Sequence, residues 1–193
     1  MNKRYWLVLA AVAAVAGVIG IGVNITLREA SGGHPRVALV PIAAQHNGQD
    51  VMFSQMMIHH HLAAIDMAAL ADRRARNAQV KTVALDIKAK QALEIEGMKQ
   101  WLVDWNESEH HDPGMQPAGT AMTDEMAKLE KASGAEFDRM FLTMMIQHHE
   151  AAIKMSETEQ AAGRYAPAKD LANTIISAQR SEITTLRQLL TQS

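Results

Sequence analysis

The sequence predicts an all-α protein: a four-helix bundle made of two duplicated helical hairpins, preceded by a transmembrane helix. The main observation is an internal duplication, in which residues 50–67 recur as residues 138–155 with 12 of 18 positions identical. At the same offset of 88 residues, the match continues without a gap into a second segment of each copy. All four segments carry apolar residues three and four positions apart, as amphipathic helices do. An uncharged run near the N-terminus predicts the membrane helix.

Residues 1–28 are predicted to form a transmembrane anchor. Lys3 and Arg4 precede an uncharged run over residues 5–27. As a helix this run would be about 33 Å long, enough to cross a hydrocarbon core of roughly 30 Å. The preceding positive charges favour an N-terminus on the inside and a domain outside the cytoplasm, in the periplasm or at the cell exterior. The alternative is a cleaved signal peptide with a cleavage site at residues 14–16.

The remainder of the chain is predicted to be a linker followed by one bundle domain. Residues 29–49 contain glycine and proline without a helical period, which is typical of a linker. Residues 50–193 form the predicted bundle, with repeats over about 50–106 and 136–191 and a crossover over 107–135. The connection inside each repeat is short, so the two helices of a repeat should form an antiparallel hairpin.

Local signals indicate where some of the helices begin. Asp50 can accept hydrogen bonds from the free amides of the first long helix, as an N-cap does. Ser133 and Glu136 have the Ser-x-x-Glu spacing of a capping box. Within the crossover, Thr123–Lys131 is predicted to form a short helix.

Composition excludes several classes of function. The chain has no cysteine, so neither a cysteine-linked lipid anchor nor a disulfide is available. Without Lys3, Arg4 and Arg28, 16 of the 19 basic residues remain against 21 acidic ones, a formal charge of −5. With no basic cluster, a nucleic acid is not an expected partner. No nucleophile–base pair, phosphate-binding glycine loop or zinc-protease helix is present, so no catalytic activity is predicted.

The repeated motif places histidines on the apolar face of the first helix of each repeat. At 100° per residue, His60 lies in the middle of a stripe rich in methionine, and His61 lies at its edge, where burial is less expected. His148 and His149 repeat this pattern. The inward stripe of each second helix carries a carboxylate; these are Glu94 and Glu182. A carboxylate that faces a core is costly unless it is paired or bound to a cation.

These inward groups predict a metal site in the bundle core. Imidazole and thioether donors without thiolate favour copper, and methionine favours Cu(I) in particular. Iron and zinc are weaker candidates, because the Glu-x-x-His pair of di-iron bundles is absent: Met57 and Met145 stand three positions before the histidines. The candidate metal ligands are His59, His60, His61, His148, His149, Met56, Met57, Met67, Met144, Met145, Met155, Glu94 and Glu182.

A structural interpretation of the same residues stays open. Methionines at helical spacing commonly serve as core filling. A histidine on an apolar face is commonly a neutral core residue bonded to a carboxylate, for which Glu94 or Glu182 would be the partner. Under this interpretation the histidines stabilise the bundle and bind no metal.

Three stretches, Asp50–His61, Gln91–Leu102 and Phe137–Glu150, resemble the domain-of-unknown-function 305 family, and the resemblance extends over about residues 45–193. It implies a ferritin-like four-helix bundle, usually exported or membrane-anchored. Some members of that family are periplasmic copper-binding proteins linked to copper tolerance. His59 departs from the family pattern, which usually has proline there, and would extend a site in the first repeat only.

The motifs and the resemblance together predict a membrane-anchored, extracytoplasmic protein that binds copper as Cu(I) for sequestration or handover. The membrane, through residues 5–27, and a copper-delivering or copper-accepting protein are the partners that this role implies. Two alternatives remain. A ferritin-like metal-dependent oxidase would bind iron and consume oxygen, whereas a non-catalytic interaction bundle would use its histidines structurally.

Overall fold

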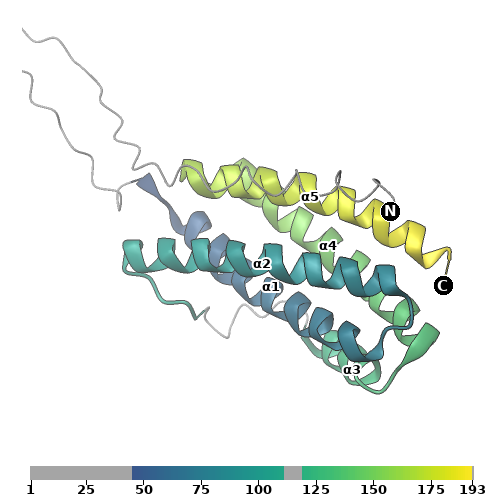
Figure 1. Ribbon diagram of the computed structural model, residues 1–193. Helices are drawn as coiled ribbons and strands as arrows, with labels where there is room; N and C mark the ends of the chain where they lie inside the picture. The colour runs from purple at the N-terminus through teal and green to yellow at the C-terminus, as the bar shows by residue number, and fades with distance from the viewer. Residues whose placement is uncertain (1–44, 111–118, 193) are drawn as a thin grey trace, which may run out of the picture. The chain divides into compact units, whose positions relative to one another are not determined.

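The computed structural model describes residues 45–110 and 119–192, which lie in the compact unit that spans Pro41–Ser193. Every element in these ranges is helical apart from one isolated bridge between Ala75 and Gly134 (Figure 1). Four helices are long and one is short: α1 (Gly48–Arg74), α2 (Ala78–Trp105), α3 (Gly119–Leu129), α4 (Gly134–Ala162) and α5 (Ala166–Leu190).

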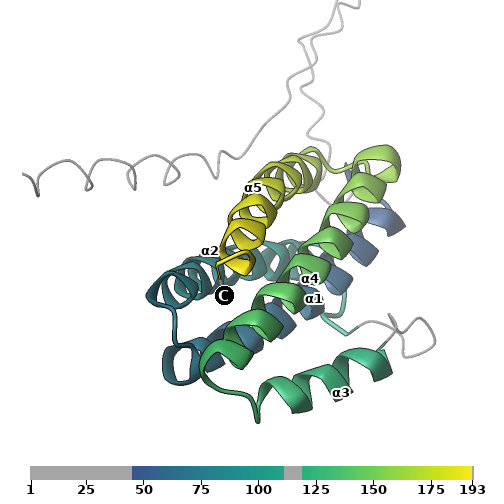
Figure 2. The same cartoon turned by 90° about the vertical axis from the view of Figure 1, so that its right-hand side faces the viewer.

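The four long helices pair as two hairpins, each closed by a connection of three residues. α1 packs along α2, α4 packs along α5, and the hairpins meet mainly through α1 and α4, which lie side by side in both views (Figures 1 and 2). α3 lies against α4. This arrangement confirms the predicted all-α bundle of four main helices. The short helix expected at Thr123–Lys131 is present as α3, four residues earlier at its start.

The predicted starts of the two repeats need correction. Asn47, not Asp50, is the N-cap of α1: its side chain accepts hydrogen bonds from the backbone amides of Gln49 and Asp50. The Asp50 carboxylate accepts in return from the amide of Asn47 at 2.6 Å, so Asp50 is the third residue of a capping box. Ser133 is the N-cap of α4, but its side chain makes no capping hydrogen bond.

Two buried aspartates connect the hairpins across a pseudo-two-fold axis. Asp50, at the start of α1, accepts hydrogen bonds from the amides of Arg164 and Tyr165 in the α4–α5 connection, at 2.9 and 2.8 Å. Asp138, at the start of α4, accepts from the amides of Arg76 and Asn77 in the α1–α2 connection, at 3.1 and 2.9 Å. The two sets of residues are equivalent in the repeat: Asp50 and Asp138, Arg76 and Arg164, and Asn77 and Tyr165 are each 88 residues apart. Each repeat therefore anchors the connection of the other, and α1 and α4 run antiparallel.

The core consists of two apolar clusters, which we name after their phenylalanines. The Phe53 cluster joins the start of α1 to the end of α2 and the start of α5: Phe53, Met57, Ile58, Ile95, Met98, Leu102, Trp105, Ala152, Ala168, Ala172 and Ile175. The Phe137 cluster joins the end of α1 to the starts of α2 and α4 and the end of α5; its larger members include Met67, Val80, Ile87, Phe137, Phe141, Met144, Met145 and Leu186. Between the two clusters, buried polar residues interrupt each long helix.

The predicted anchor, residues 1–28, and most of the predicted linker lie outside the described residues. Of the helices in the described ranges, none is both long and apolar enough to span a bilayer.

Candidate metal centre

A layer of polar side chains separates the two apolar clusters. We call it the histidine layer; it contains His60, His61, Gln91, His148, His149 and Gln179. α1 and α4 each supply two adjacent histidines, and α2 and α5 each supply one glutamine at the equivalent position of the repeat. The stripe prediction therefore identified the right faces of all four helices.

Burial of the histidines differs from the expectation in one respect. His61 and His149, predicted at the edges of their stripes, are both 0% exposed, and His148 is 2% exposed. His60, predicted at the centre of its stripe, keeps some exposed surface. The lower expectation of burial for His61 and His149 was wrong, because these residues face the second helix of their own hairpin.

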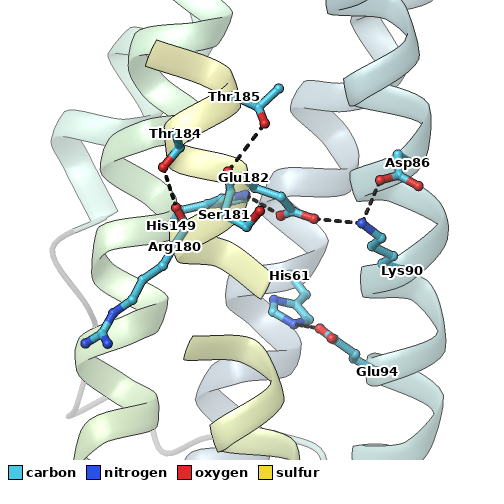
Figure 3. A network of polar contacts seen from close by, with 10 residues as sticks. All are labelled: His61, Asp86, Lys90, Glu94, His149, Arg180, Ser181, Glu182, Thr184 and Thr185. Atoms are coloured by element: carbon cyan, nitrogen blue, oxygen red, sulfur yellow. Dashed lines mark hydrogen bonds and ion pairs between the residues drawn. The ribbon is translucent and has the colours of Figure 1, made fainter. Parts of the chain in front are cut away.

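A carboxylate from that second helix holds each fully buried histidine (Figure 3). The Nε2 atom of His61 lies 2.6 Å from Glu94 Oε2, and that of His149 lies 2.9 Å from Glu182 Oε2. A carboxylate only accepts hydrogen bonds, so Nε2 carries the proton. In the neutral imidazole Nδ1 then keeps its lone pair, which is the arrangement found in carboxylate–histidine–metal sites.

His148 is oriented in the same way by a backbone carbonyl. Its Nε2 atom donates to the carbonyl oxygen of His60 at 2.8 Å. The rings of His60 and His148 contact each other between α1 and α4, with centroids 3.6 Å apart and planes tilted by 41°. His148 Nδ1 is therefore also an unprotonated donor atom.

The Nδ1 atoms are buried and lack partners. In the described part of the chain, none of the four Nδ1 atoms of His60, His61, His148 and His149 has a hydrogen-bond partner. A buried polar atom without a partner costs free energy, so it calls for an explanation. A bound metal ion would satisfy the lone pairs of His61, His148 and His149, and imidazole nitrogen is a donor type that suits such an ion.

Electrostatics keep the central histidines uncharged. Burial, together with the neighbouring His61 and His149, lowers the pKa of His60 from 6.5 to about 3. Burial and the nearby His60 and His149 also lower the pKa of His148 well below its usual value. Both imidazoles are therefore neutral at neutral pH, and the neutral form is the one that binds metal.

The predicted methionines lie on both sides of the histidine layer. Met57 belongs to the Phe53 cluster, with Met155 packed against it from a partly buried position, and Met67, Met144 and Met145 belong to the Phe137 cluster. Met56 is partly buried, and His59 is exposed, outside the buried layer. Within residues 45–110 and 119–192, no three His, Cys, Asp or Glu side chains form a group arranged to hold a metal ion. The available donors are imidazole nitrogens in the layer and methionine thioethers in the clusters on either side of it, which suit a soft ion.

Two features of the layer were absent from the predicted ligand set. Gln91 and Gln179 are buried, and both polar atoms of the Gln91 amide and the Gln179 Oε1 atom are unpartnered in the described structure. Their recurrence at the repeat offset was the signal that could have identified them. Lys90 is the other: its ammonium lies 3.1 Å from Glu182 Oε1 and 2.6 Å from Asp86 (Figure 3). No sequence pattern indicated it, because it has no counterpart in the second repeat.

Lys90 shifts the titration of the carboxylate that it contacts. Burial alone would raise the pKa of Glu182, but hydrogen bonds from His149 and Lys90 outweigh burial and hold it below its usual value. Burial would likewise lower the pKa of Lys90, yet its hydrogen bonds to Asp86 and Glu182 raise it. This lysine is therefore charged and Glu182 ionised at neutral pH.

A family model described as "Domain of unknown function (DUF305)" matches residues 50–190, which include all of the bundle except the first two residues of α1. The chain belongs to the DUF305 family. No curated protein matches it. Solved DUF305 structures resemble the bundle: a fragment from Deinococcus radiodurans is 29% identical, with a TM-score of 0.69 over 77% of this chain and 99% of that one. A predicted secreted DUF305 protein from Streptomyces coelicolor is 27% identical, with a TM-score of 0.68 over 75% and 91% of the two chains.

This DUF305 chain is also similar to CopM, whose structures include Cu(I)-bound and Cu(II)-bound forms. The identity is 31% and the TM-score 0.63, over 74% of this chain and 96% of CopM. The similarity covers the bundle and connects this fold with copper binding in a distant relative.

Proposed function

We propose that this protein binds copper in the histidine layer, preferentially as Cu(I), and sequesters it or hands it over outside the cytoplasm. The observation that carries the proposal is the set of buried, unpartnered Nδ1 atoms. His61, His148 and His149 each have Nε2 held by an acceptor, so each directs its unprotonated nitrogen away from that acceptor. These three Nδ1 atoms can therefore bind a cation without first losing a proton.

The type of metal follows from the donors. Imidazole nitrogens, with methionine thioethers in the apolar clusters on either side and no thiolate in the chain, form a soft donor set that favours Cu(I). The carboxylates of Glu94 and Glu182 are engaged with histidine, so they would support the ligands rather than bind the metal first. The copper-bound structures of CopM, at 31% identity, support the same choice. Bound copper would supply affinity and redox chemistry, and the chain contributes the oriented nitrogens.

The location outside the cytoplasm rests on the N-terminal sequence. Lys3 and Arg4 before the uncharged run over residues 5–27 favour export of the bundle. The relative from Streptomyces coelicolor, described as a predicted secreted protein, supports export, and the absence of cysteine is compatible with it. A copper-delivering or copper-accepting protein would then be the partner.

Competitive metal titration tests this function. The purified full chain, first freed of metal by a chelator, is titrated with Cu(I), Cu(II), Zn(II) and Fe(II) against indicators of known affinity. We expect Cu(I) to bind most tightly. Tightest binding of Fe(II), with oxygen consumption, would favour the oxidase, and binding of no metal would favour structural histidines.

A further inference from the structure

The two histidine–glutamate pairs of the layer are equivalent by repeat but differ in charge. Glu182 contacts His149 through one oxygen and Lys90 through the other. Glu94 contacts His61, and no cation lies within ion-pair distance of it in the described structure. Figure 3 shows the difference: Lys90 and Asp86 extend the Glu182 pair, whereas the Glu94 pair stands by itself.

The repeat explains why one pair has a lysine. Lys90 lies on α2 and reaches across to Glu182 on α5. The position equivalent to Lys90, 88 residues later on α5, is Ala178, and the position equivalent to Asp86 is Thr174. Ala178 has no charged group, so the second repeat supplies no ammonium to Glu94 from the position equivalent to Lys90.

We propose that Lys90 is a positioning residue that makes the two pairs unequal, so that the His61–Glu94 pair binds a soft metal cation before the His149–Glu182 pair does. The inference rests on the proposed metal binding and adds to it an order of loading. Lys90 touches no ligand atom and acts through Glu182.

Two electrostatic effects of Lys90 act in the same direction. An ammonium at 3.1 Å draws negative charge from the Glu182 carboxylate, so this carboxylate polarises the His149 N–H less and Nδ1 becomes a weaker donor. The same positive charge also repels an incoming cation. Asp86 shares the ammonium and offsets part of its charge; Lys90 and Asp86 are 50% and 58% exposed, so water screens both and keeps the effect of Lys90 modest.

The hydrogen-bond lengths agree with this order. The bond is 2.6 Å in the pair without lysine and 2.9 Å in the pair with it. Burial does not account for the difference, because the two histidine side chains are both 0% exposed and the glutamate side chains are 18% and 16% exposed. The shorter bond is the one in the pair whose carboxylate is not shared with a lysine.

The test uses a symmetric pair of substitutions in the full-length chain. The imidazole nitrogens of His61 and His149 are followed by 15N NMR during titration with Ag(I), a redox-stable substitute for Cu(I). In the unmodified protein, His61 Nδ1 should respond at lower silver than His149 Nδ1. Because Lys90 is half exposed, the expected difference in affinity is about two- to fivefold. Lys90→Ala should remove most of it, and Lys90→Arg, which keeps the charge, should preserve it.

The decisive comparison uses a double variant in which the lysine is moved from α2 to the equivalent position on α5. Lys90→Ala combined with Ala178→Lys should invert the order, so that His149 responds first; a loss of packing alone would not do this. Simultaneous responses in the unmodified protein, or an unchanged order after the exchange, would overturn the role of Lys90 and leave metal binding intact. The absence of any response of either imidazole to silver or to Cu(I) would overturn the metal function itself and the loading order with it.

Discussion

In the described part of the chain, His61, His148 and His149 are each fixed in one tautomer by a single acceptor. Glu94, Glu182 and the His60 carbonyl hold the proton on Nε2, so that Nδ1 is left as a lone pair without any change in protonation. The affinity of the layer for a cation should therefore depend on groups that never touch it.

Replacement of a supporting carboxylate tests this dependence. Glu94→Gln keeps an oxygen that can accept from His61 but removes the negative charge, so Cu(I) affinity should fall by about 10- to 100-fold. Competitive titration with a coloured Cu(I) chelator measures the change. Glu96→Gln, at an exposed position on the same helix, is the control and should leave the affinity unchanged. Equal affinities of the Glu94→Gln variant and the unmodified protein would argue against a supporting role.

Glu159 is a second buried acid, outside the layer and without a counterpart, since Ala71 occupies the equivalent position. It lies against Gly163, where an added Cβ would overlap Glu159 Oε1. Burial and the neighbouring Asp50 raise the pKa of Glu159 from 4.5 to about 8, although Gln49 and Lys169 oppose the shift.

This shift predicts how stability depends on pH. Below pH 4.5 the acid is neutral in both the folded and unfolded states. Between 4.5 and about 8 only the unfolded state ionises, so the free energy of unfolding should fall as pH rises and level off above 8. Glu159→Gln should flatten this decline and raise the melting temperature at pH 8. Thermal unfolding from pH 5 to 9 measures it, with exposed Glu157→Gln as control; parallel curves for the Glu159 variant and the unmodified protein would refute it.

Sequence reasoning identified the histidines but misjudged the edges of the stripe. A helical wheel centred on His60 places His61 100° away, which on an isolated helix means the border with solvent. In the bundle α1 has two neighbours, so His60 faces α4 and His61 faces Glu94 on α2. The helical wheel gave the direction of each side chain correctly, but it could not show which neighbouring helix lies in that direction. The contact between Lys90 and Glu182 could not be predicted from the sequence for the same reason, because it joins two different hairpins.

At the scale of helices and connections, long-range hydrogen bonds decide the roles of the polar residues. Asp50 is a plausible N-cap by residue type, yet Asn47 fills that position, and Asp50 combines the capping box with anchoring of the α4–α5 connection. Short-range signals locate a helix start to within a few residues. They do not show that a side chain also serves a loop 114 residues away.

Removal of the equivalent anchor should destabilise the bundle. Asp138→Ala leaves the amides of Arg76 and Asn77 without their charged acceptor, so the free energy of unfolding should fall by about 2 to 3 kcal/mol. Urea denaturation followed by circular dichroism measures the change. The control is Asp66→Ala, at an exposed position within α1, for which a change of less than about 0.5 kcal/mol is expected. A similar loss of unfolding free energy in both variants would show that the Asp138 anchor does not stabilise the bundle more than an exposed aspartate does.

At the scale of the whole molecule, the constant offset of the repeat predicted the pairing of hairpins and the equivalence of their sites. The two His–Glu pairs, the two aspartate anchors and the two glutamines all recur at 88 residues. Duplication was therefore the most informative feature of the sequence for the fold. The same feature conceals departures from symmetry, such as Lys90 and Glu159, whose effects depend on three-dimensional neighbours.

The topology of the chain is a prediction at this scale. Because of Lys3, Arg4 and the uncharged run over residues 5–27, a reporter enzyme fused after Ser193 should be active outside the cytoplasm. The protein should also stay with the membrane fraction after a high-salt wash. A reporter active only in the cytoplasm would refute export, and a shorter soluble form would identify the segment as a cleaved signal.

The central claim is that the buried imidazoles bind Cu(I), and one competitive Cu(I) titration tests it most directly. The unmodified chain is compared with the His61→Gln/His149→Gln variant, whose amides can still donate to Glu94 and Glu182 but lack the Nδ1 lone pairs. We expect the unmodified protein to take Cu(I) from the chelator and the variant, at comparable helicity, to bind it at least tenfold more weakly, a loss of about 1.4 kcal/mol or more. Equal Cu(I) affinities in the two proteins would contradict the account.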